Sequence, residues 1–296
     1  MTIIPFDDRD GWIWMDGHFV PWRDAKVHVL THGLHYGSCV FEGERLYNGK
    51  IFKLTEHTRR LFRSAEILEM EIPFTVEEID AACIETVARM GFSDAYIRPV
   101  AWRGPEQMGV AAQATKTHVA IAAWEWPSYF DPETKRRGIK MMHAPYARPA
   151  PNSAPTEAKA AGLYMICTLS KHAAERAGYA DALMLDYRGY VAEATGANIF
   201  FVKDGVIHTP LADCFLNGLT RQTVIDLARS RGFDVIERHI QPEEMTSFTE
   251  CFITGSAAEV TPVAEIGDYR FTPGNISLSL MEDYSQLVRG KLVVEA

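Results

Sequence analysis

The chain has 296 residues, of which 47% are hydrophobic and 23% are charged. This is the composition of a folded globular protein, not of a disordered, collagen-like or repetitive chain, and the length suits two domains. Lysine and arginine number 30 against 39 aspartate and glutamate residues, so the formal net charge is −9. An acidic chain without a basic run lacks the positive surface that binds nucleic acid or an anionic membrane, so neither partner is expected.

The first residues contain no basic segment followed by a long apolar run, so a secretory signal is not expected. The longest apolar runs, such as 119–124, are far too short to cross a bilayer. Five cysteines are widely spaced and include no Cys-x-x-Cys pair. This pattern is typical of buried free thiols in a reducing compartment, and we expect a cytoplasmic protein.

Four turn dipeptides that separate apolar runs predict β-hairpins. They are Asp16-Gly17 and Asn48-Gly49 in the N-terminal half, and Arg188-Gly189 and Asp204-Gly205 in the C-terminal half. Such dipeptides accept the positive φ that tight hairpins need. Both halves of the chain should therefore contain antiparallel sheet.

Helix signals lie between these hairpins. In the N-terminal half, Thr55 is predicted to cap one helix, and Thr75 with Glu78 forms a capping box for the next, which should end at Gly91. The predicted buried faces of these helices consist of apolar residues at helical spacing, namely Leu61, Ala65, Leu68, Ile79, Cys83, Val87 and Met90.

In the C-terminal half, residues 162–178 have helical periodicity, and Thr220 is predicted to cap a helix over 221–231. Prolines and turn formers at 126–132 break both periodicities and mark a domain boundary. We therefore predict an α+β protein of two domains. The predicted bounds are 1–128 for the N-terminal domain, 129–137 for an interdomain loop and 138–296 for the C-terminal domain.

Lys159 is a candidate nucleophile. It follows a proline-rich loop, and its neighbours Ala158, Ala160 and Ala161 leave room beside its side chain. A lysine amine that is shielded from water can attack a carbonyl group or form a Schiff base. Taken alone, the pattern also fits an ordinary exposed lysine, because alanine-rich helices display lysines routinely.

Glu193 is a candidate partner for a cation. It stands among small residues ahead of the apolar run 199–202. An acid buried at the end of a strand is costly without a cation, and a protonated ring nitrogen would be a suitable one. A strand glutamate that faces solvent fits the same pattern.

Two glycine-containing turns are candidate anion sites. Residues 216–220 directly precede a predicted helix, whose terminal N–H groups and Thr220 hydroxyl can bind an anion, although a plain helix cap fits as well. Residues 254–258 form a second such turn after a strand. Arg59 and Arg60 offer guanidinium groups either for a phosphate or for surface ion pairs.

No metal site is predicted. His28, His32 and His35 are spaced four and three residues apart, but Gly33 and Gly37 interrupt any helix there. No acidic residue or cysteine stands at ligand spacing from these histidines.

Several stretches of the sequence, including some discussed above, occur together and in one order in a single known family. The sequence resembles the fold-type IV pyridoxal-phosphate enzymes, and closely resembles branched-chain amino-acid aminotransferases, over about residues 12–262. The resemblance is carried by residues 25–29, residues 34–45, Glu56-His57-x-x-Arg60-Leu61, residues 95–99, residues 108–110, residues 158–164, Glu193-x-x-Gly196-x-Asn198 and residues 255–262. Leu163, Asn217 and Ser256 depart from residues common in the family, but none of them removes a catalytic group.

The resemblance implies an α+β fold of type IV, similar to D-amino-acid aminotransferase, with a C-terminal pseudo-barrel and with pyridoxal 5'-phosphate between the domains. It implies that Lys159 binds the cofactor covalently, that Glu193 pairs with the pyridine nitrogen, and that Tyr164 hydrogen-bonds the phenolic oxygen. The residues implied to hold the phosphate are Arg60, Leu219, Thr220 and Ser256.

The implied reaction is transamination of leucine, isoleucine and valine with 2-oxoglutarate by ping-pong kinetics, with Lys159 moving the Cα proton. The implied substrate residues form an apolar wall, a set that meets the side-chain carboxylate of glutamate, and two amides for the α-carboxylate. The wall is Phe41, Trp126 and Tyr129. The carboxylate set is Tyr36, Tyr96 and Arg98, and the two amides are those of Ala257 and Ala258. Arg98 indicates the substrate class, because a planar guanidinium suits a carboxylate and has no use with a simple amine donor.

Three alternatives are kept beside this interpretation. Two share the fold: a D-amino-acid or (R)-amine transaminase, and an enzyme similar to aminodeoxychorismate lyase, which releases pyruvate. The third is a non-catalytic phosphate-binding or scaffold protein, for which Lys159, Tyr164, Glu193 and both anion turns would be accidents. The resemblance also implies a homodimer or a dimer-based hexamer, in which a neighbouring subunit completes the pocket.

Overall fold

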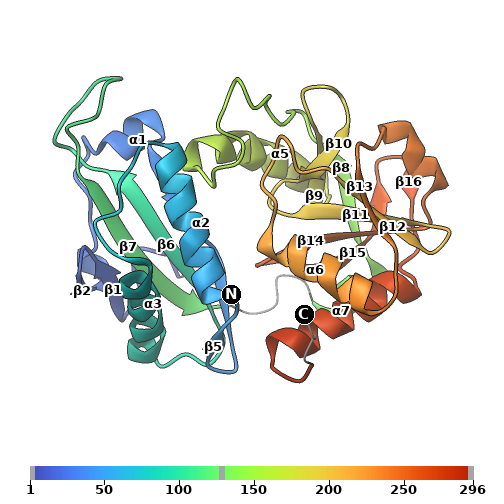
Figure 1. Ribbon diagram of the computed structural model, residues 1–296, viewed down its shortest axis with the longest axis horizontal. Coiled ribbons are helices and arrows are strands. Elements are labelled where there is room, and N and C mark those ends of the chain that lie inside the picture. Colours follow the sequence, from blue (N-terminus) through green and yellow to red (C-terminus); the bar gives the residue numbers. More distant parts are fainter. Residues whose placement is uncertain (1–3, 127–130, 293–296) are drawn as a thin grey trace. The chain divides into compact units, whose positions relative to one another are not determined.

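The computed structural model describes residues 4–126 and 131–292 (Figure 1). The chain divides into two compact units. Unit 1 contains the residues up to 127 together with 158–162, and unit 2 contains 128–157 and the residues from 163 onward. Lys159 therefore belongs to unit 1, although it lies far along the chain from the other residues of that unit.

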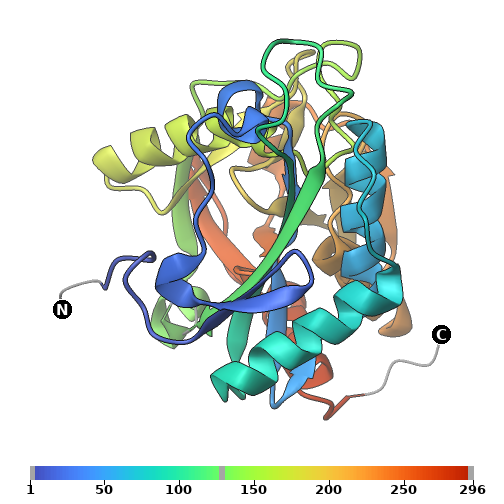
Figure 2. The same cartoon turned by 90° about the vertical axis from the view of Figure 1, so that its left-hand side faces the viewer.

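Unit 1 is built on an antiparallel sheet. Its strands are β1 (Trp12–Met15), β2 (His18–Pro21), β3 (Cys39–Phe41), β4 (Glu44–Tyr47), β5 (Lys50–Ile51), β6 (Ala95–Arg103) and β7 (Thr117–Glu125). The order across the sheet is β2-β1-β7-β6-β4-β5, and β3 also pairs with β6. Helices α2 (Leu54–Ile67) and α3 (Val76–Met90) lie along one side of these strands, as Figures 1 and 2 show, and α1 (His32–Tyr36) is a short helix before β3.

The local signals of unit 1 are mostly confirmed. Turns join β1 to β2 and β4 to β5 where the dipeptides predict them. Thr75 and Glu78 make both hydrogen bonds of the capping box, and α3 ends at Gly91, whose φ of 70° is left-handed. The prediction for Thr55 is wrong: α2 begins at Leu54 with Lys53 as its N-cap, and the Thr55 hydroxyl donates to Asp80 at 2.5 Å instead.

Strand β6 presents different residues to its two sides. Ile97 and Ala101 are fully buried, whereas Arg98 and Val100, on the opposite face, are half-buried. Arg98 and Val100 line a pocket of about 450 Å³, together with residues of β1, β7 and the segment around α1. The sheet therefore separates an apolar core from a concave face that carries a charged residue.

Unit 2 contains a closed barrel, which confirms the predicted pseudo-barrel. Strand β10 pairs with both β9 and β11, and this closes the path β10-β9-β8-β15-β14-β11 into a ring. The ring strands are β8 (Ile139–His143), β9 (Asp181–Leu185), β10 (Val191–Ala194), β11 (Asn198–Lys203), β14 (Glu250–Gly255) and β15 (Glu259–Ile266). Buried apolar residues such as Phe201, Ile253 and Val263 form its core.

The remaining elements of unit 2 extend or cover this barrel. Strands β12 (Val206–Pro210), β13 (Val235–Arg238) and β16 (Tyr269–Arg270) pair at its margins, and the helices are α4 (Pro132–Arg137), α5 (Tyr164–Arg176), α6 (Leu219–Ser230) and α7 (Asn275–Val288). The hairpins predicted at Arg188-Gly189 and Asp204-Gly205 are present. No helix in the described ranges is both long and apolar enough to span a membrane.

Two local predictions in unit 2 need correction. The segment predicted as a loop at 129–137 includes α4, because the Asp131 carboxylate accepts hydrogen bonds from the backbone of Glu133 and Thr134 and caps that helix. Thr220 does not cap α6; Gly218 is the N-cap, and Thr220 lies in the first turn.

Candidate active site

Lys159 is held by backbone contacts within unit 1. Its N–H donates to the Ser64 Oγ at 3.0 Å, and its carbonyl accepts from the Phe41 N–H at 3.1 Å. The next residue, Ala160, forms a β-bridge with Val40. The segment around Lys159 thus acts as a short extra strand beside β3, which fixes the start of the lysine side chain.

The end of the Lys159 side chain lies beside an aromatic and cationic cluster. Its Nζ is 5.1 Å from the centre of the Phe41 ring, and the Arg98 guanidinium carbon is 4.6 Å from the same centre. Arg98 Nη2 donates to the Tyr96 hydroxyl at 3.1 Å. A Cβ at Gly43 would lie 2.0 Å from that hydroxyl, so glycine is required there. The structure therefore brings Lys159 together with three predicted substrate residues.

The other predicted substrate residues of unit 1 have different surroundings. Trp126 packs against Tyr96, with ring centres 5.1 Å apart. Tyr36 ends α1, stacks on His32 at 4.6 Å and is 48% exposed. Tyr129 lies outside the described residues.

Arg98 gives the pocket on this face of the sheet its chemical character. It is the only charged residue that lines the pocket in the part of the chain that the structure describes. Its buried Nε has no hydrogen-bond partner among the described residues. A planar guanidinium with an unpaired edge in an apolar wall can bind a carboxylate and still leave room for an aliphatic side chain.

Arg60 is fixed by a buried acid. Its Nε and Nη2 donate to the two oxygens of Glu42 at 2.6 and 2.8 Å, and His57 Nδ1 lies 2.7 Å from the same carboxylate. Burial would raise the pKa of Glu42, but Arg60 and His57 outweigh it and hold that pKa well below its usual range. The neighbouring Arg59 is exposed, whereas Arg60 is half-buried and held in one orientation.

Glu44, two residues from Glu42, has no such cation to itself. It is fully buried, and the Cys83 thiol lies beside its carboxyl group. Burial and the negative charges of Glu42 and Asp80 raise its pKa well above the usual value. Its surroundings therefore disfavour the ionised form of Glu44.

In unit 2, Glu193 lies on β10 and contacts Arg148 and Asn198. Its Oε1 is 3.3 Å from the Arg148 Nε, and its Oε2 accepts from the Asn198 Nδ2 at 3.2 Å. Arg148 is buried, yet its pKa is raised, because Glu193, Cys167 and Tyr164 outweigh the effect of burial. Tyr164 is the first residue of α5. Glu193 and Tyr164, two of the predicted cofactor residues, are thus both close to Arg148.

The two predicted anion turns lie at the same end of the barrel. The first contains Gly218, whose N–H donates to the Asn198 Oδ1 at 3.2 Å, followed by Leu219 and Thr220 in the first turn of α6. The second follows β14, where Thr254 is the register partner of Asn198. Both turns therefore border Asn198.

The second turn also carries an unpaired polar atom. The Thr254 Oγ1 is buried and has no hydrogen-bond partner among the described residues. Ser256 and Ala257 are half-buried in the turn that follows, and Ala258 is buried. An orphaned hydroxyl beside two turns and a helix N-terminus fits an anionic group such as a phosphate.

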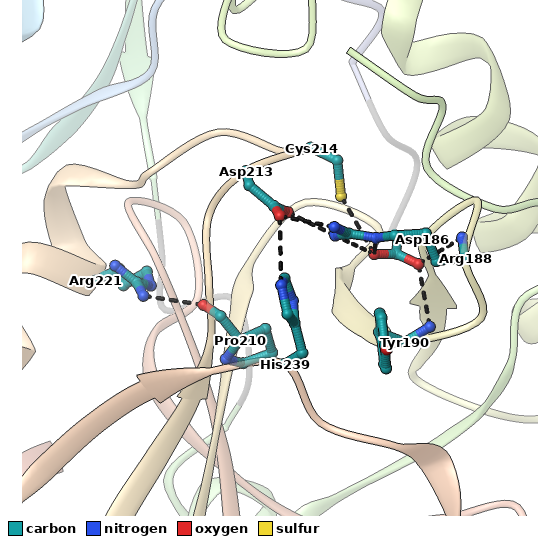
Figure 3. Close-up of polar contacts among 8 residues, drawn as sticks. All are labelled: Asp186, Arg188, Tyr190, Pro210, Asp213, Cys214, Arg221 and His239. Atoms are coloured by element: carbon teal, nitrogen blue, oxygen red, sulfur yellow. Dashed lines mark hydrogen bonds and ion pairs between the residues drawn. The ribbon is translucent and has the colours of Figure 1, made fainter.

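A cluster around Arg188 braces the loop before the first turn (Figure 3). Arg188 donates to both oxygens of Asp213 at 2.8 and 2.9 Å, and its Nε and Nη2 donate to Asp186 at 2.9 and 2.6 Å. The Cys214 thiol also contacts Asp186, at 3.7 Å. The Arg188 guanidinium therefore engages both carboxylates, including oxygens that a metal ion would need as ligands.

Arg221 braces the same loop from α6. Its guanidinium donates to the Pro210 carbonyl at 3.0 Å and to the Asn217 Oδ1 at 2.9 Å. The Asn217 side chain is thereby tied to α6. The loop between Pro210 and Leu219 is thus held at both ends.

Sequence reasoning missed three residues that hold the predicted ones in place: Glu42, Arg148 and Asn198. Glu42 and Asn198 lie within the quoted family stretches, and the adjoining Gly43 was a usable signal for close packing around Glu42. Arg148 lies in the proline-rich loop, and nothing in its local sequence connects it to Glu193.

The chain is similar to known proteins over most of its length. The family model described as amino-transferase class IV matches residues 39–266. A branched-chain-amino-acid aminotransferase of Pseudomonas aeruginosa is 44% identical over 98% of this chain and 96% of its own. Two crystal structures of the T.th. branched-chain amino acid aminotransferase each cover 96% of both chains. The complex with N-(5'-phosphopyridoxyl)-L-glutamate is 41% identical with a TM-score of 0.91, and the form with pyridoxamine 5'-phosphate is 42% identical with a TM-score of 0.92.

Proposed function

The chain belongs to the class IV aminotransferase family, and from this premise we propose that it transaminates branched-chain L-amino acids with pyridoxal 5'-phosphate as cofactor. Leucine, isoleucine or valine gives the 2-oxo acid, and 2-oxoglutarate gives L-glutamate. The observation that carries the choice of substrate is Arg98, a guanidinium with an unpaired edge in an otherwise apolar pocket beside Phe41. Such a pocket accepts both an aliphatic side chain and the side-chain carboxylate of glutamate.

The residues present fit the cofactor. Lys159 would hold it covalently, Glu193 would pair with its pyridine nitrogen, and Tyr164 would donate to its phenolic oxygen. Arg148 and Asn198 hold the Glu193 carboxylate in one orientation, which that pairing requires. When bound, the cofactor supplies an electron sink for the electron pair that remains as the Cα–H bond breaks.

The phosphate would be bound mainly by backbone. The Leu219 and Thr220 amides lie at the N-terminus of α6, where the helix dipole favours an anion, and the Thr220 hydroxyl adds a donor. Ser256 in the second turn would contribute its hydroxyl. Arg60 would add a charge, with its guanidinium held in advance by Glu42.

Lys159 would also move the proton. Its amine takes the proton from the substrate Cα and delivers it to the C4′ position, acting first as base and then as acid. The backbone contacts of Lys159 with Phe41 and Ser64 fix the base of its side chain, which limits the positions that its amine can take.

The substrate residues divide by chemistry. Phe41, Trp126 and Tyr129 would form the apolar wall, Tyr36, Tyr96 and Arg98 would meet the glutamate side-chain carboxylate, and the Ala257 and Ala258 amides would take the α-carboxylate. Arg98 is already hydrogen-bonded to Tyr96, so the two act as one unit toward a carboxylate.

Product analysis tests this function. The purified protein with pyridoxal phosphate, L-leucine and 2-oxoglutarate should form 4-methyl-2-oxopentanoate and L-glutamate in equal amounts. D-alanine and (R)-1-phenylethylamine should give no oxo product, and aminodeoxychorismate should release no pyruvate. Turnover of D-alanine, of the amine or of aminodeoxychorismate, without turnover of L-leucine, would contradict the proposed function and support the corresponding alternative.

We also propose that the protein works as a homodimer or a dimer-based hexamer in the cytoplasm. Support for self-association comes from apolar side chains exposed on unit 1, which include Val29, Leu34 and Tyr36. Support for a reducing compartment comes from the cysteines, all five of which are free thiols. Sedimentation equilibrium should give at least twice the chain mass of 33.2 kDa.

A further inference from the structure

Asn198 contacts two parts of the candidate site at once. It is the first residue of β11 and is only 5% exposed. Its Nδ2 donates to the Glu193 Oε2 at 3.2 Å and to the Leu216 carbonyl at 3.0 Å, while its Oδ1 accepts from the Gly218 N–H at 3.2 Å. One amide group thus joins the acid assigned to the pyridine nitrogen and the turn assigned to the phosphate.

The fold fixes Asn198 in this position. Asn198 and Glu193 are register partners on β11 and β10, and the Ala194 N–H to Ala197 carbonyl bond of 2.8 Å closes the tight turn between them. The orientation of the amide is also determined. A flipped amide would direct its NH2 group at the Gly218 N–H and its oxygen at the Glu193 carboxylate, with repulsion at both.

Gly218 supplies independent evidence that the amide is closely fitted. A Cβ at residue 218 would lie 2.3 Å from the Asn198 Oδ1. The backbone of Gly218 has φ −62° and ψ 141°, which any residue adopts without strain. The requirement for glycine at 218 therefore comes from the Asn198 side chain and not from the backbone.

We propose that Asn198 is a positioning residue for cofactor binding, which sets the distance between the Glu193 carboxylate and the phosphate turn at 216–220. The pyridine nitrogen and the phosphate belong to one small molecule, so the groups that bind them must be held at a matching separation. The loop before the turn is irregular, and Asn198 ties it directly to Glu193. This inference rests on the proposed function, because it takes the cofactor contacts of Glu193 and of the turn from there.

The test uses changes at both ends of the contact. Asn198→Asp keeps the shape and the acceptor for Gly218 but replaces the donor with a carboxylate oxygen that faces Glu193 and the Leu216 carbonyl. Gly218→Ala keeps asparagine at position 198, but the added methyl group pushes the Asn198 side chain away from residue 218. The double variant Asn198→Ala with Gly218→Ala removes the side chain that the new methyl group meets. Thr209→Val is the matched control, since Thr209 is fully buried and donates one hydrogen bond to the Ile199 carbonyl.

The readout is the Kd of pyridoxal phosphate for the apoprotein, titrated by tryptophan fluorescence, with a thermal melt of every variant. Asn198→Asp should raise the Kd about tenfold, as the loss of hydrogen bonds to a charged group does. Gly218→Ala should raise the Kd about tenfold in the natural background but less than about twofold when Asn198 is already alanine. Thr209→Val should lower the melting temperature and leave the Kd unchanged.

Two results would overturn the proposal. One is an equal effect of Gly218→Ala on the Kd in both backgrounds, and the other is an Asn198→Asp variant with a lowered melting temperature but an unchanged Kd. If Asn198→Asp does not fold, the Gly218→Ala cycle decides alone. A natural protein that binds pyridoxal phosphate but does not transaminate L-leucine would refute the proposed substrate, and these Kd values would still support or overturn the role of Asn198.

Discussion

The groups that the proposed function takes from the two units differ in kind. In unit 1 these groups are side chains, above all Lys159 and Arg98, and they project from strands or from the bridge beside β3. In unit 2, apart from Glu193 and Tyr164, they are mainly backbone amides of two turns, and side chains such as Asn198 and Arg188 hold those turns in place. Changes in unit 1 should therefore remove chemistry, whereas changes in unit 2 should loosen binding.

The units also differ in how they bury acids. Unit 2 gives Glu193 a cation and an amide donor. Unit 1 buries two acids close together; Arg60 bonds to Glu42, while burial and the nearby negative charges raise the pKa of Glu44. A buried carboxylate without its own cation stays neutral, and stability then depends on pH.

The largest effect should follow from Lys159→Ala. Loss of the group assigned to both cofactor attachment and proton transfer should lower kcat/KM for L-leucine by at least about 10⁴-fold. Stopped-flow and steady-state assays measure this, with Lys140→Ala, an exposed lysine of β8, as the control that keeps full activity. Retained turnover in Lys159→Ala would contradict the assignment of the nucleophile.

Arg98→Ala should separate the two substrates. Loss of a charge-assisted contact should lower kcat/KM for L-glutamate and 2-oxoglutarate by about 10- to 100-fold, while the value for L-leucine changes less than about threefold. Arg98→Lys should restore only part of the loss, since an ammonium group cannot make the planar contact. Half-reaction kinetics with each substrate provide the measurement, and an equal loss for both substrates would show that Arg98 does not bind the carboxylate.

Glu44→Gln should stabilise unit 1 in a pH-dependent way. The folded-state pKa of Glu44 lies above the usual 4.5. At acid pH the residue is protonated in both the folded and the unfolded chain, so its ionisation does not change the free energy of unfolding. It then destabilises the fold by up to about 1.4 kcal/mol per pH unit as the pH rises toward the folded pKa. Urea unfolding at pH 5 and pH 8 should therefore show a larger gain for Glu44→Gln at pH 8. The exposed Glu66→Gln is the control, and the same gain at both pH values would mean that Glu44 is ionised in the folded protein.

The smallest effect is expected from Arg188→Ala. It removes the clasp between Asp186 and Asp213 that braces the loop before the phosphate turn, so the Kd of pyridoxal phosphate should rise about three- to tenfold. kcat at saturating cofactor should stay within about twofold. Arg23→Ala is the matched control, because Arg23 also pairs with two aspartates, Asp8 and Asp10, but in an exposed part of unit 1. A Kd unchanged in Arg188→Ala would show that the loop keeps its position without the clasp.

The sequence predicted local structure best where one residue type has one conformational role. The four hairpin turns and the capping box of α3 followed from glycine, asparagine and threonine at fixed offsets. It did less well at helix starts: Thr55 and Thr220 both lie inside the first turn, because tertiary contacts moved the N-cap to Lys53 and Gly218. Helix boundaries depend on such tertiary contacts, and the periodicity of the sequence does not reveal them.

For the candidate site, the sequence identified the groups that would touch ligands but not those that hold them. Lys159, Glu193 and the anion turns stood out because their chemistry is unusual among small residues. Arg148 was missed, since its pairing with Glu193 joins residues that are 45 positions apart only through the closed barrel. The raised pKa of Glu44 was also inaccessible, because it depends on burial beside Glu42 and Asp80.

The most direct test of the central claim is a visible absorption spectrum of the purified protein with pyridoxal phosphate, recorded before and after each of four amino donors. We predict that L-leucine and L-glutamate both convert the cofactor band to that of the pyridoxamine form, while D-alanine and (R)-1-phenylethylamine leave it unchanged. A band that responds only to D-alanine or to the amine would contradict the branched-chain assignment. Absence of any band after addition of the cofactor would contradict the assignment of the cofactor site itself.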